Sequence, residues 1–279
     1  MNKKARHNIG IIGLGQMGGS FAMVLKPVKH FRAVIGYDVK SSLVMHAIND
    51  GIIDKTADSE DDLIEKSQVV VLAVPISVIL AILERHRHTL STKTLVVDLG
   101  GVRGSIQRTS ARLKMKNHVG IHPICGTAHK GRSAWNGSLY KGASCFVFSN
   151  KLTNDNSIRR ARKLIRLVGG CSVSIDHRKH DYAFAVTSGI PHILAFSLMK
   201  VRTDSRGIPI ELEGPSFTGA TRVSASDSIM TGEMLYHNRD NLLKAVSRLE
   251  KNINKIKKLL SSDDSTKLAQ TLESYGQSS

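Results

Sequence analysis

A glycine-rich stretch near the N-terminus constrains the fold of this chain more than any other feature of its sequence. Gly13, Gly15 and Gly18 form the pattern G-x-G-x-x-G, directly after the apolar run Asn8–Ile12 and at the opening of a helical pattern. The first glycine of such a loop permits a tight turn, the second lets the backbone approach a pyrophosphate, and the third lets helix and strand pack closely. The helix that follows offers free N–H groups to the phosphates. The stretch therefore predicts a strand–loop–helix unit that binds a dinucleotide.

An acidic residue after the second expected strand supports this prediction. Asp38 lies about 20 residues after Gly18, where a carboxylate accepts hydrogen bonds from a ribose 2′-hydroxyl. A carboxylate there repels a 2′-phosphate, so the sequence favours NAD over NADP, although Lys40 leaves NADP open. The other residues that we expect to contact the cofactor are Gln16, Met17, Val74 and Pro75.

Short β-branched runs alternate with helical patterns through the first half of the chain, which is typical of a doubly wound parallel sheet. The expected strands are Asn8–Ile12, Ala33–Tyr37, Gln68–Ala73, Thr94–Val97, His118–Ile121, Ala143–Phe148 and Ser172–Ile175. After about residue 176 the strand signals stop and long helical patterns follow. We therefore predict an α/β chain, with a Rossmann dinucleotide-binding domain over residues 6–175 and an all-helical substrate and dimerisation domain over residues 176–279.

Apolar residues near the C-terminus recur at alternating spacings of four and three, as in a short heptad seam. They are Leu242, Val246, Leu249, Ile253, Ile256 and Leu260. Such a seam either packs within its own domain or forms a subunit interface, and the spacing alone leaves both open.

Composition adds a strong positive charge and few cysteines. The chain holds 40 Lys and Arg against 23 Asp and Glu, for a net charge of +17, which favours anionic partners and makes nucleic acid the first candidate. However, we find no helix-turn-helix, RNP or zinc-finger pattern, and only 5% aromatic residues for base stacking. Nucleic-acid binding therefore stays an alternative, and a solvated basic surface is the preferred interpretation. Arg103 is a candidate to gather anionic ligands in a cleft.

The three cysteines, Cys125, Cys145 and Cys171, form no C-x-x-C pair, which argues against a disulfide framework or a zinc site and fits a reducing cytoplasm. The longest apolar run, Val69–Leu83, contains Pro75 and is shorter than the roughly 20 residues that span a membrane. We expect a cytoplasmic protein that binds neither a metal nor a membrane.

Three further segments gather polar residues. Asp98-x-Gly-x-Val-Arg-Gly and His122-Pro-x-x-Gly-Thr follow two expected strands, at the sheet edge where open α/β sheets bind ligands. The helical half carries His180-Asp181, Pro191-His192 and the series Phe217-x-x-x-Thr221-Arg222-x-x-x-Ser226-Asp227. In order and spacing, these segments together with the glycine loop resemble the prephenate and arogenate dehydrogenase family of tyrosine biosynthesis. The resemblance extends from about residue 8 to residue 245.

The resemblance implies oxidation of a 4-hydroxycyclohexadiene that bears a ring carboxylate, with hydride transfer to NAD(P), loss of carbon dioxide and aromatisation. It implies that His122 accepts the proton of the ring hydroxyl, a role that suits an imidazole near neutral pH. It also implies that Arg222 pairs with the carboxylate. Thr127, His180 and His192 would line the same pocket, in the cleft between the two domains of the chain. The resemblance also implies a homodimer that is joined through the helical domain.

Plainer roles compete with these. His122 could cap a strand end, His180 and His192 could be satisfied by local hydrogen bonds, and Arg222 could pair with Asp227. Trp135 and Tyr182 are expected to be packing residues.

The chain also departs from the family at two positions expected in the pocket. Gly101 stands where the family usually has serine, and Gly189 where it usually has histidine. Each loss removes a hydrogen-bond partner worth about 0.5–1.5 kcal/mol. The substrate therefore stays open between prephenate, arogenate and a variant such as 4-amino-4-deoxyprephenate. A β-hydroxyacid dehydrogenase, which relies on a lysine that has no clear counterpart here, and a relative that binds nucleotide without catalysis are the remaining alternatives.

Overall fold

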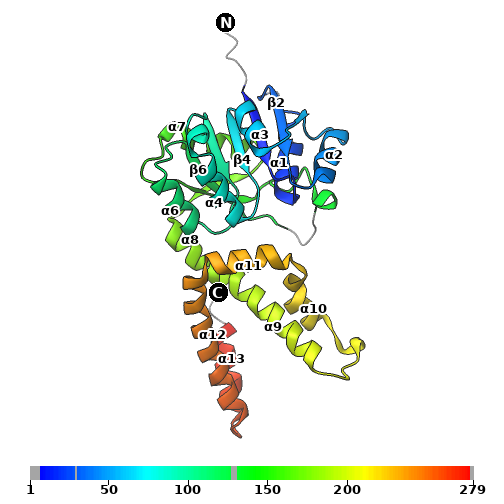
Figure 1. Cartoon of the computed structure of the whole chain (residues 1–279). Helices are drawn as coiled ribbons and strands as arrows, with labels where there is room; N and C mark the ends of the chain where they lie inside the picture. Colours follow the sequence, from blue (N-terminus) through cyan, green and yellow to red (C-terminus); the bar gives the residue numbers. More distant parts are fainter. Residues whose placement is uncertain (1–6, 29, 127–130, 277–279) are drawn as a thin grey trace.

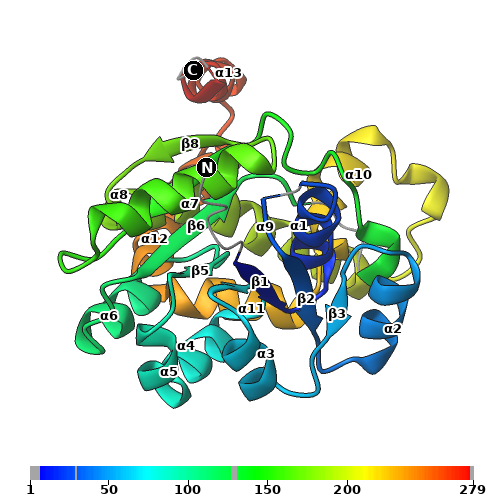
Figure 2. The same cartoon turned by 90° about the horizontal axis from the view of Figure 1, so that it is seen from above.

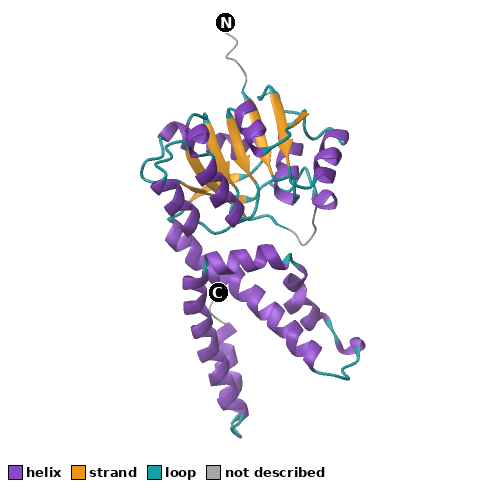
Figure 3. Ribbon diagram, in the orientation of Figure 1, coloured by secondary structure: helices purple, strands orange, loops and turns teal. Residues whose placement is uncertain are grey.

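The computed structural model describes residues 7–28, 30–126 and 131–276. It consists of an α/β part and a helical part that lies against one end of the sheet (Figure 1). Among these described residues, strands occur only in the first part, and helices form most of the second (Figure 3). This is the fold class that the sequence predicts. Where one domain ends and the other begins, between residues 175 and 176, stays a prediction.

Eight strands form one sheet in the order β3-β2-β1-β4-β5-β6-β7-β8. Their bounds are β1 Asn8–Ile12, β2 Ala33–Tyr37, β3 Lys55–Thr56, β4 Val69–Leu72, β5 Leu95–Asp98, β6 His118–Pro123, β7 Ser144–Phe148 and β8 Cys171–Ser174. Neighbours are parallel except β6 and β7, which pair antiparallel, with His122 opposite Phe146. The sheet is therefore mostly rather than wholly parallel, and the short strand β3 is an addition to the expected set.

Helices cover both faces of the sheet (Figure 2). They are α1 Gln16–Leu25, α2 Ser41–Asn49, α3 Glu60–Lys66, α4 Ile76–Arg85, α5 Arg87–Ser91, α6 Gly104–Arg112 and α7 Asp155–Leu167. Alternate residues of the central strands enter two separate cores, because successive side chains of a strand point to opposite faces. Val69 and Val71 of β4 pack with α1 and α7, whereas Val70 and Leu72 pack with α3 and α4.

The helical part begins with one long helix. It comprises α8 His177–Phe184, a π-helical turn over Ala185–Gly189, and α9 Ile190–Asp204. The helices α10 Pro215–Thr221, α11 Ser228–His237, α12 Arg239–Leu260 and α13 Ser265–Gly276 follow. Helix α13 runs back beside α12 (Figure 1).

The heptad positions of α12 have two different surroundings. Leu242, near the start of α12, is buried against the rest of the chain, whereas Ile253 and Leu260 are 48% and 68% exposed. Packing within the domain thus accounts for the first part of the seam only.

By length and composition alone, residues His177–Asp204 are long and apolar enough to cross a membrane. The helix spans 28 residues; an 18-residue window within it has a mean hydropathy of 1.4, and 17% of that window is buried in this chain. Core helices of soluble proteins meet the same criterion. A search for continuous apolar runs misses this segment, because polar residues are interspersed among its apolar ones.

Candidate active site

The glycine loop joins the end of β1 to the start of α1, and its geometry explains two of the glycines. Gly13 has a φ of +91°, in the left-handed region that favours glycine, and its N–H donates to the Tyr37 carbonyl at 2.8 Å. A side chain at Gly18 would overlap the Gly13 carbonyl oxygen. Around Gly15, by contrast, the space that a side chain would fill is open. The backbone at Gly15 is therefore accessible to a ligand.

The surroundings of this loop fit the phosphates and ribose of a dinucleotide. Helix α1 begins after Gly15 without a side-chain cap and without an acidic residue in its first turn, so the positive end of its dipole faces no acidic residue of that turn and favours an anion. Asp38 lies beside the loop, because its Oδ2 accepts from the Leu14 N–H at 2.7 Å and its Oδ1 from the Lys40 N–H at 2.8 Å. Val74 borders the loop from the end of β4, with its Cγ1 2.7 Å from the point where Gly13 would carry a Cβ.

The catalytic candidate His122 lies at the end of β6 and is 8% exposed. Its Nδ1 is 2.9 Å from Nε2 of His180, and Nδ1 of His180 is 2.9 Å from Oδ1 of Asp181. A carboxylate can only accept, so Nδ1 of His180 carries a proton and its Nε2 accepts one from Nδ1 of His122. The order of hydrogen bonds therefore leaves the unprotonated nitrogen of His122 at Nε2. We call these three residues the His–His–Asp chain.

Asp181 is fixed by the start of α6. Its Oδ1 accepts from the Arg103 N–H at 3.0 Å and its Oδ2 from the Gly104 N–H at 2.7 Å. The Asp181 carbonyl also accepts from Nδ2 of Asn238, at 2.7 Å. A carboxylate at a helix N-terminus is stabilised by the helix dipole. These contacts join the helical part to the α/β part at the His–His–Asp chain.

Aromatic rings enclose the two histidines. The Phe184 ring meets His122 edge-on at 4.8 Å between centroids, and the Phe148 ring meets His180 at 4.9 Å. Burial lowers the pKa of His122 to about 3, and the positive charge of the nearby Arg103 adds to this lowering. His122 is therefore neutral near pH 7, with its lone pair at Nε2.

The free nitrogen of His122 faces Gly101. A Cβ at Gly101 would lie 3.5 Å from Nε2 of His122 and 3.8 Å from the Phe184 ring. Gly101 thus adjoins the side of the imidazole that is left without a hydrogen-bond partner in the His–His–Asp chain.

Arg103 is not the anion-gathering residue that the sequence suggested. It is fully buried, and its NH2 donates to Oδ2 of Asp98 at 2.8 Å. His118 contacts the same carboxylate oxygen at 3.0 Å. Burial alone would raise the pKa of Asp98, but the charge and hydrogen bonds of Arg103 hold it below its usual range. Arg103 therefore balances a buried carboxylate beneath the site.

Three further residues predicted for the pocket, Gly189, His192 and Arg222, lie in the helical part. A side chain at Gly189 would overlap Leu242 of α12, so the position of the family's histidine is filled by leucine here. His192 is half-buried in α9, and its Nδ1 donates to the Ser188 carbonyl at 2.8 Å, which leaves its Nε2 free of that bond. Arg222 is exposed, in a 3₁₀ turn over Arg222–Ala225.

The sequence also suggested an ion pair between Asp227 and Arg222 as an alternative role, and a place for Thr127 in the pocket. Asp227 caps α11, accepting from the Ile229 and Met230 N–H groups, each at 3.0 Å. Thr127 lies outside the described residues.

The structure thus brings Gly101, His122 and His180 together. It also reveals two contributors that sequence reasoning left without a role, Asp181 and Phe184. The adjacency of Asp181 to His180 in one motif was the available signal for the former.

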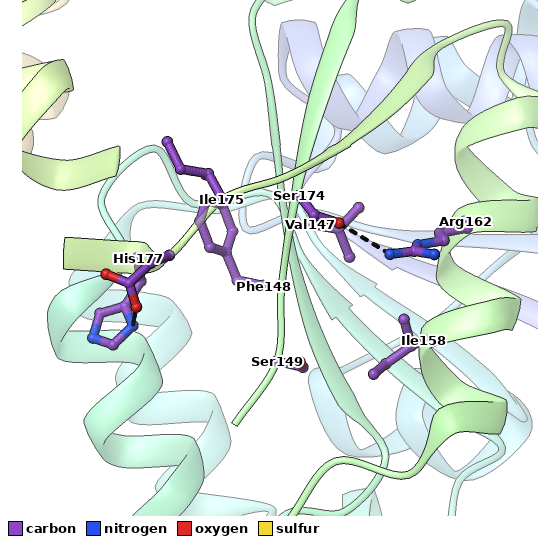
Figure 4. Close-up of a pocket in the computed structure, with 9 residues that line it drawn as sticks. Val147, Phe148, Ser149, Ile158, Arg162, Ser174, Ile175 and His177 are labelled. Carbon is purple, nitrogen blue, oxygen red and sulfur yellow. Dashed lines mark hydrogen bonds and ion pairs between the residues drawn. The ribbon is translucent and has the colours of Figure 1, made fainter. Parts of the chain in front are cut away.

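A separate cavity of about 380 Å³ lies between β7, β8, α7 and the start of α8 (Figure 4). Arg162 donates to Oγ of Ser174 there at 3.0 Å. The cavity shares Phe148 with the surroundings of His180 but includes neither His122 nor the glycine loop. Across the described part of the chain, no group of three or more His, Cys, Asp and Glu side chains is placed to hold a metal ion.

Comparison with known proteins gives concordant results. A family model described as the nucleotide-binding domain of prephenate dehydrogenase matches residues 21–174, and one described as the prephenate dehydrogenase dimerization domain matches residues 176–274. A prephenate dehydrogenase of Bacillus subtilis is 25% identical over 269 residues, which cover 94% of this chain and 72% of that protein. A cyclohexadienyl dehydrogenase of Zymomonas mobilis is 26% identical, over 92% of this chain and 89% of that protein.

Among solved structures, prephenate dehydrogenase from Aquifex aeolicus, in complex with hydroxyphenyl propionate and NAD+, superposes with a TM-score of 0.89 at 28% identity. That superposition covers 99% of this chain and 98% of the other.

Proposed function

Because this chain belongs to the prephenate dehydrogenase family, we propose that it oxidises prephenate or arogenate with His122 as the base that accepts the ring hydroxyl proton. The chain is an NAD(P)-dependent enzyme of that family. The observation that carries the proposal is the His–His–Asp chain, because it leaves a neutral, buried imidazole with its lone pair at Nε2. NAD, when bound, takes the hydride that leaves the hydroxyl-bearing carbon.

Proton movement in this proposal involves His122 and its two partners only. As the hydride leaves, the hydroxyl proton passes to Nε2 of His122 and the hydroxyl-bearing carbon becomes a carbonyl. The carboxyl group then leaves as carbon dioxide, its bonding electron pair passes through the ring to the oxygen, and the aromatic phenolate takes the proton back from His122. The positive charge that forms on His122 is stabilised through Nδ1, which donates to His180, which in turn donates to Asp181. The phenylalanine rings around the histidines limit the access of water to this proton.

The two glycine departures from the family have different expected consequences. At Gly101 the missing hydroxyl leaves space next to Nε2 of His122, so the substrate hydroxyl contacts the imidazole without help from a neighbouring serine. At Gly189 the missing imidazole is replaced by packing of Leu242. We propose that both changes alter the substrate pocket while leaving the base in place.

The ring carboxylate is proposed to bind Arg222, with His192 and Thr127 lining the same pocket. A guanidinium can hold a carboxylate through two parallel hydrogen bonds. His192 supports this arrangement through its Nε2, because its Nδ1 is already engaged with the backbone.

Arg222→Gln is expected to raise KM for prephenate about 10- to 100-fold, since a hydrogen bond to a charged group is worth about 1.5–3 kcal/mol. Steady-state kinetics on the purified protein measure this. Arg222→Lys retains the charge but not the two parallel hydrogen bonds, so its KM should lie between those of the wild type and Arg222→Gln. The matched control is Arg206→Gln, an exposed arginine of the same helical part, which should leave KM unchanged. An unaltered KM in Arg222→Gln would remove Arg222 from the site.

The family's dimerization domain supports assembly of two copies, and we propose a homodimer joined through residues 176–279. Apolar side chains of α11 and α12 are exposed in the single chain, with Ile229 at 74% and Leu243 at 65%. A partner subunit could cover these side chains and parts of the helix His177–Asp204. This contact would explain the apolar composition of that helix without a membrane. We likewise propose a cytoplasmic location and assign most of the +17 charge to the solvated surface.

A further inference from the structure

The single tryptophan of the chain contacts the nucleotide loop directly. Trp135 follows a 3₁₀ turn over Gly131–Ala134, in the connection between β6 and β7. Its indole Nε1 donates to the carbonyl oxygen of Leu14 at 2.9 Å and to that of Gly15 at 3.2 Å. The sequence suggested only a packing role, yet this side chain bonds to the two peptide units at the centre of the glycine loop.

Two neighbours of Trp135 bind the next residues of α1. The Asn136 N–H donates to Oγ of Ser20 at 3.0 Å, and the Tyr140 hydroxyl donates to the Met17 carbonyl at 2.7 Å. We call Trp135, Asn136 and Tyr140 the clasp. Its three hydrogen-bonding groups join the glycine loop and the first turns of α1 to the segment that follows β6, the strand that carries His122.

The sequence of α1 leaves room for the indole of Trp135 at Gly19. A side chain at Gly19 would overlap the indole ring of Trp135. Helix α1 therefore carries a glycine outside the G-x-G-x-x-G pattern, and the indole ring of Trp135 occupies the space that its missing side chain leaves. The Tyr140 ring also packs edge-on against Phe21, with ring centroids 5.3 Å apart.

The hydrogen bonds from Trp135 fix the direction of the loop's N–H groups. In a trans peptide unit, the carbonyl and the following N–H point in opposite directions. With the Leu14 and Gly15 carbonyls turned toward the indole, the N–H groups of Gly15 and Gln16 point away from it. These N–H groups stand at the uncapped start of α1, where the space beside Gly15 is open.

We propose that Trp135 is a positioning residue for the cofactor, which holds these two peptide units in the orientation that binds the pyrophosphate. The inference concerns the nucleotide-binding half of the proposed function and does not depend on which substrate is oxidised. Because Trp135 is the only tryptophan and bonds to the loop itself, its fluorescence reports cofactor binding in the unmodified protein.

Trp135→Phe tests the role of the indole N–H, because it retains an aromatic ring and removes the donor. Isothermal titration calorimetry is expected to show a Kd for NAD that is about 3- to 10-fold higher than in the wild type, the loss expected for an ordinary hydrogen bond. Titration of the wild-type protein with NADH should quench the tryptophan emission and transfer energy to the reduced nicotinamide, with the Kd that calorimetry gives for NADH.

A second variant displaces the indole without removing it. Gly19→Ala places a methyl group in the ring's position and should also raise the Kd for NAD. Gly232→Ala, in α11, is the matched control, because the space around that helical glycine is open and its Kd should not change.

Thermal unfolding without ligand separates positioning from stability. Trp135→Phe is expected to weaken NAD binding under conditions where it is fully folded. An unchanged Kd in the folded Trp135→Phe variant, whatever happens to kcat, would overturn the proposal. If the wild-type protein itself bound no NAD, the proposed function would fail, which is a distinct result.

Discussion

Replacing His122 by asparagine is expected to lower kcat by about 10²- to 10⁴-fold, the range over which a positioned general base contributes to an enzymatic rate. Asparagine keeps a polar side chain at the end of β6 but cannot take the hydroxyl proton. The Kd for NAD should stay near the wild-type value, because His122 makes no contact with the glycine loop residues that are proposed to bind the cofactor. Turnover measured with saturating substrate, together with calorimetry for NAD, tests both parts.

His118→Asn is the matched control for removing a buried imidazole from the same strand. His118 contacts Asp98 and Ser110 beneath the sheet edge, so its loss should lower stability but change kcat only a few-fold. Wild-type turnover in His122→Asn would show that His122 is not the base.

The low pKa of His122 gives a readout that needs no substrate. The unfolded chain takes up a proton at this histidine near pH 6.5, whereas the folded chain does so only near its pKa of about 3. The free energy of unfolding should therefore fall as pH drops below about 6.5, by at most about 1.4 kcal/mol per pH unit from this group. His122→Asn should lack that part of the fall.

Replacing Asp181 by asparagine is expected to lower kcat by about 100-fold with little change in KM. The side-chain carbonyl oxygen of the new amide can still accept from the N–H groups at the start of α6, so its amide nitrogen turns toward His180. An amide N–H donates, which forces His180 to carry its proton on Nε2 and His122 to carry its own on Nε2 as well. The base would then face the substrate with its lone pair turned away.

Asp176→Asn is the matched control, because Asp176 caps the same helix through the Arg178 and Lys179 N–H groups and lies away from His122. Nitrogen NMR of the imidazole rings distinguishes the two tautomers directly. If Asp181→Asn retained wild-type kcat, or if its loss of kcat came without a change of tautomer at His122, the positioning role of Asp181 would be refuted.

Local periodicity and loop chemistry made much of the fold predictable. The glycine spacing located the first strand–loop–helix unit, and the β-branched runs located the other long strands to within a residue or two. Periodicity carries no information about strand direction, so the antiparallel pairing of β6 with β7 could not be predicted. Strand β3 was missed because Lys55–Thr56 is short and exposed.

The site was harder, because its essential contacts join distant residues. His122 and His180 are 58 positions apart, and only the folded chain shows that their ring nitrogens meet. From the sequence, the charged side chain of Arg103 was expected to be exposed to ligands. In the structure it is buried and pairs with Asp98. The filling of the space at Gly189 by Leu242 likewise depends on how α12 packs against the long helix.

The central claim is that this chain oxidises a cyclohexadienyl carboxylate with His122 as the base. The most direct test mixes the purified protein with NAD and either prephenate or arogenate, and follows the absorbance of reduced nicotinamide together with the release of carbon dioxide. The account predicts equal amounts of both with at least one substrate, and a rate that falls steeply in His122→Asn. It is contradicted if neither substrate yields reduced nicotinamide while calorimetry shows that NAD is bound.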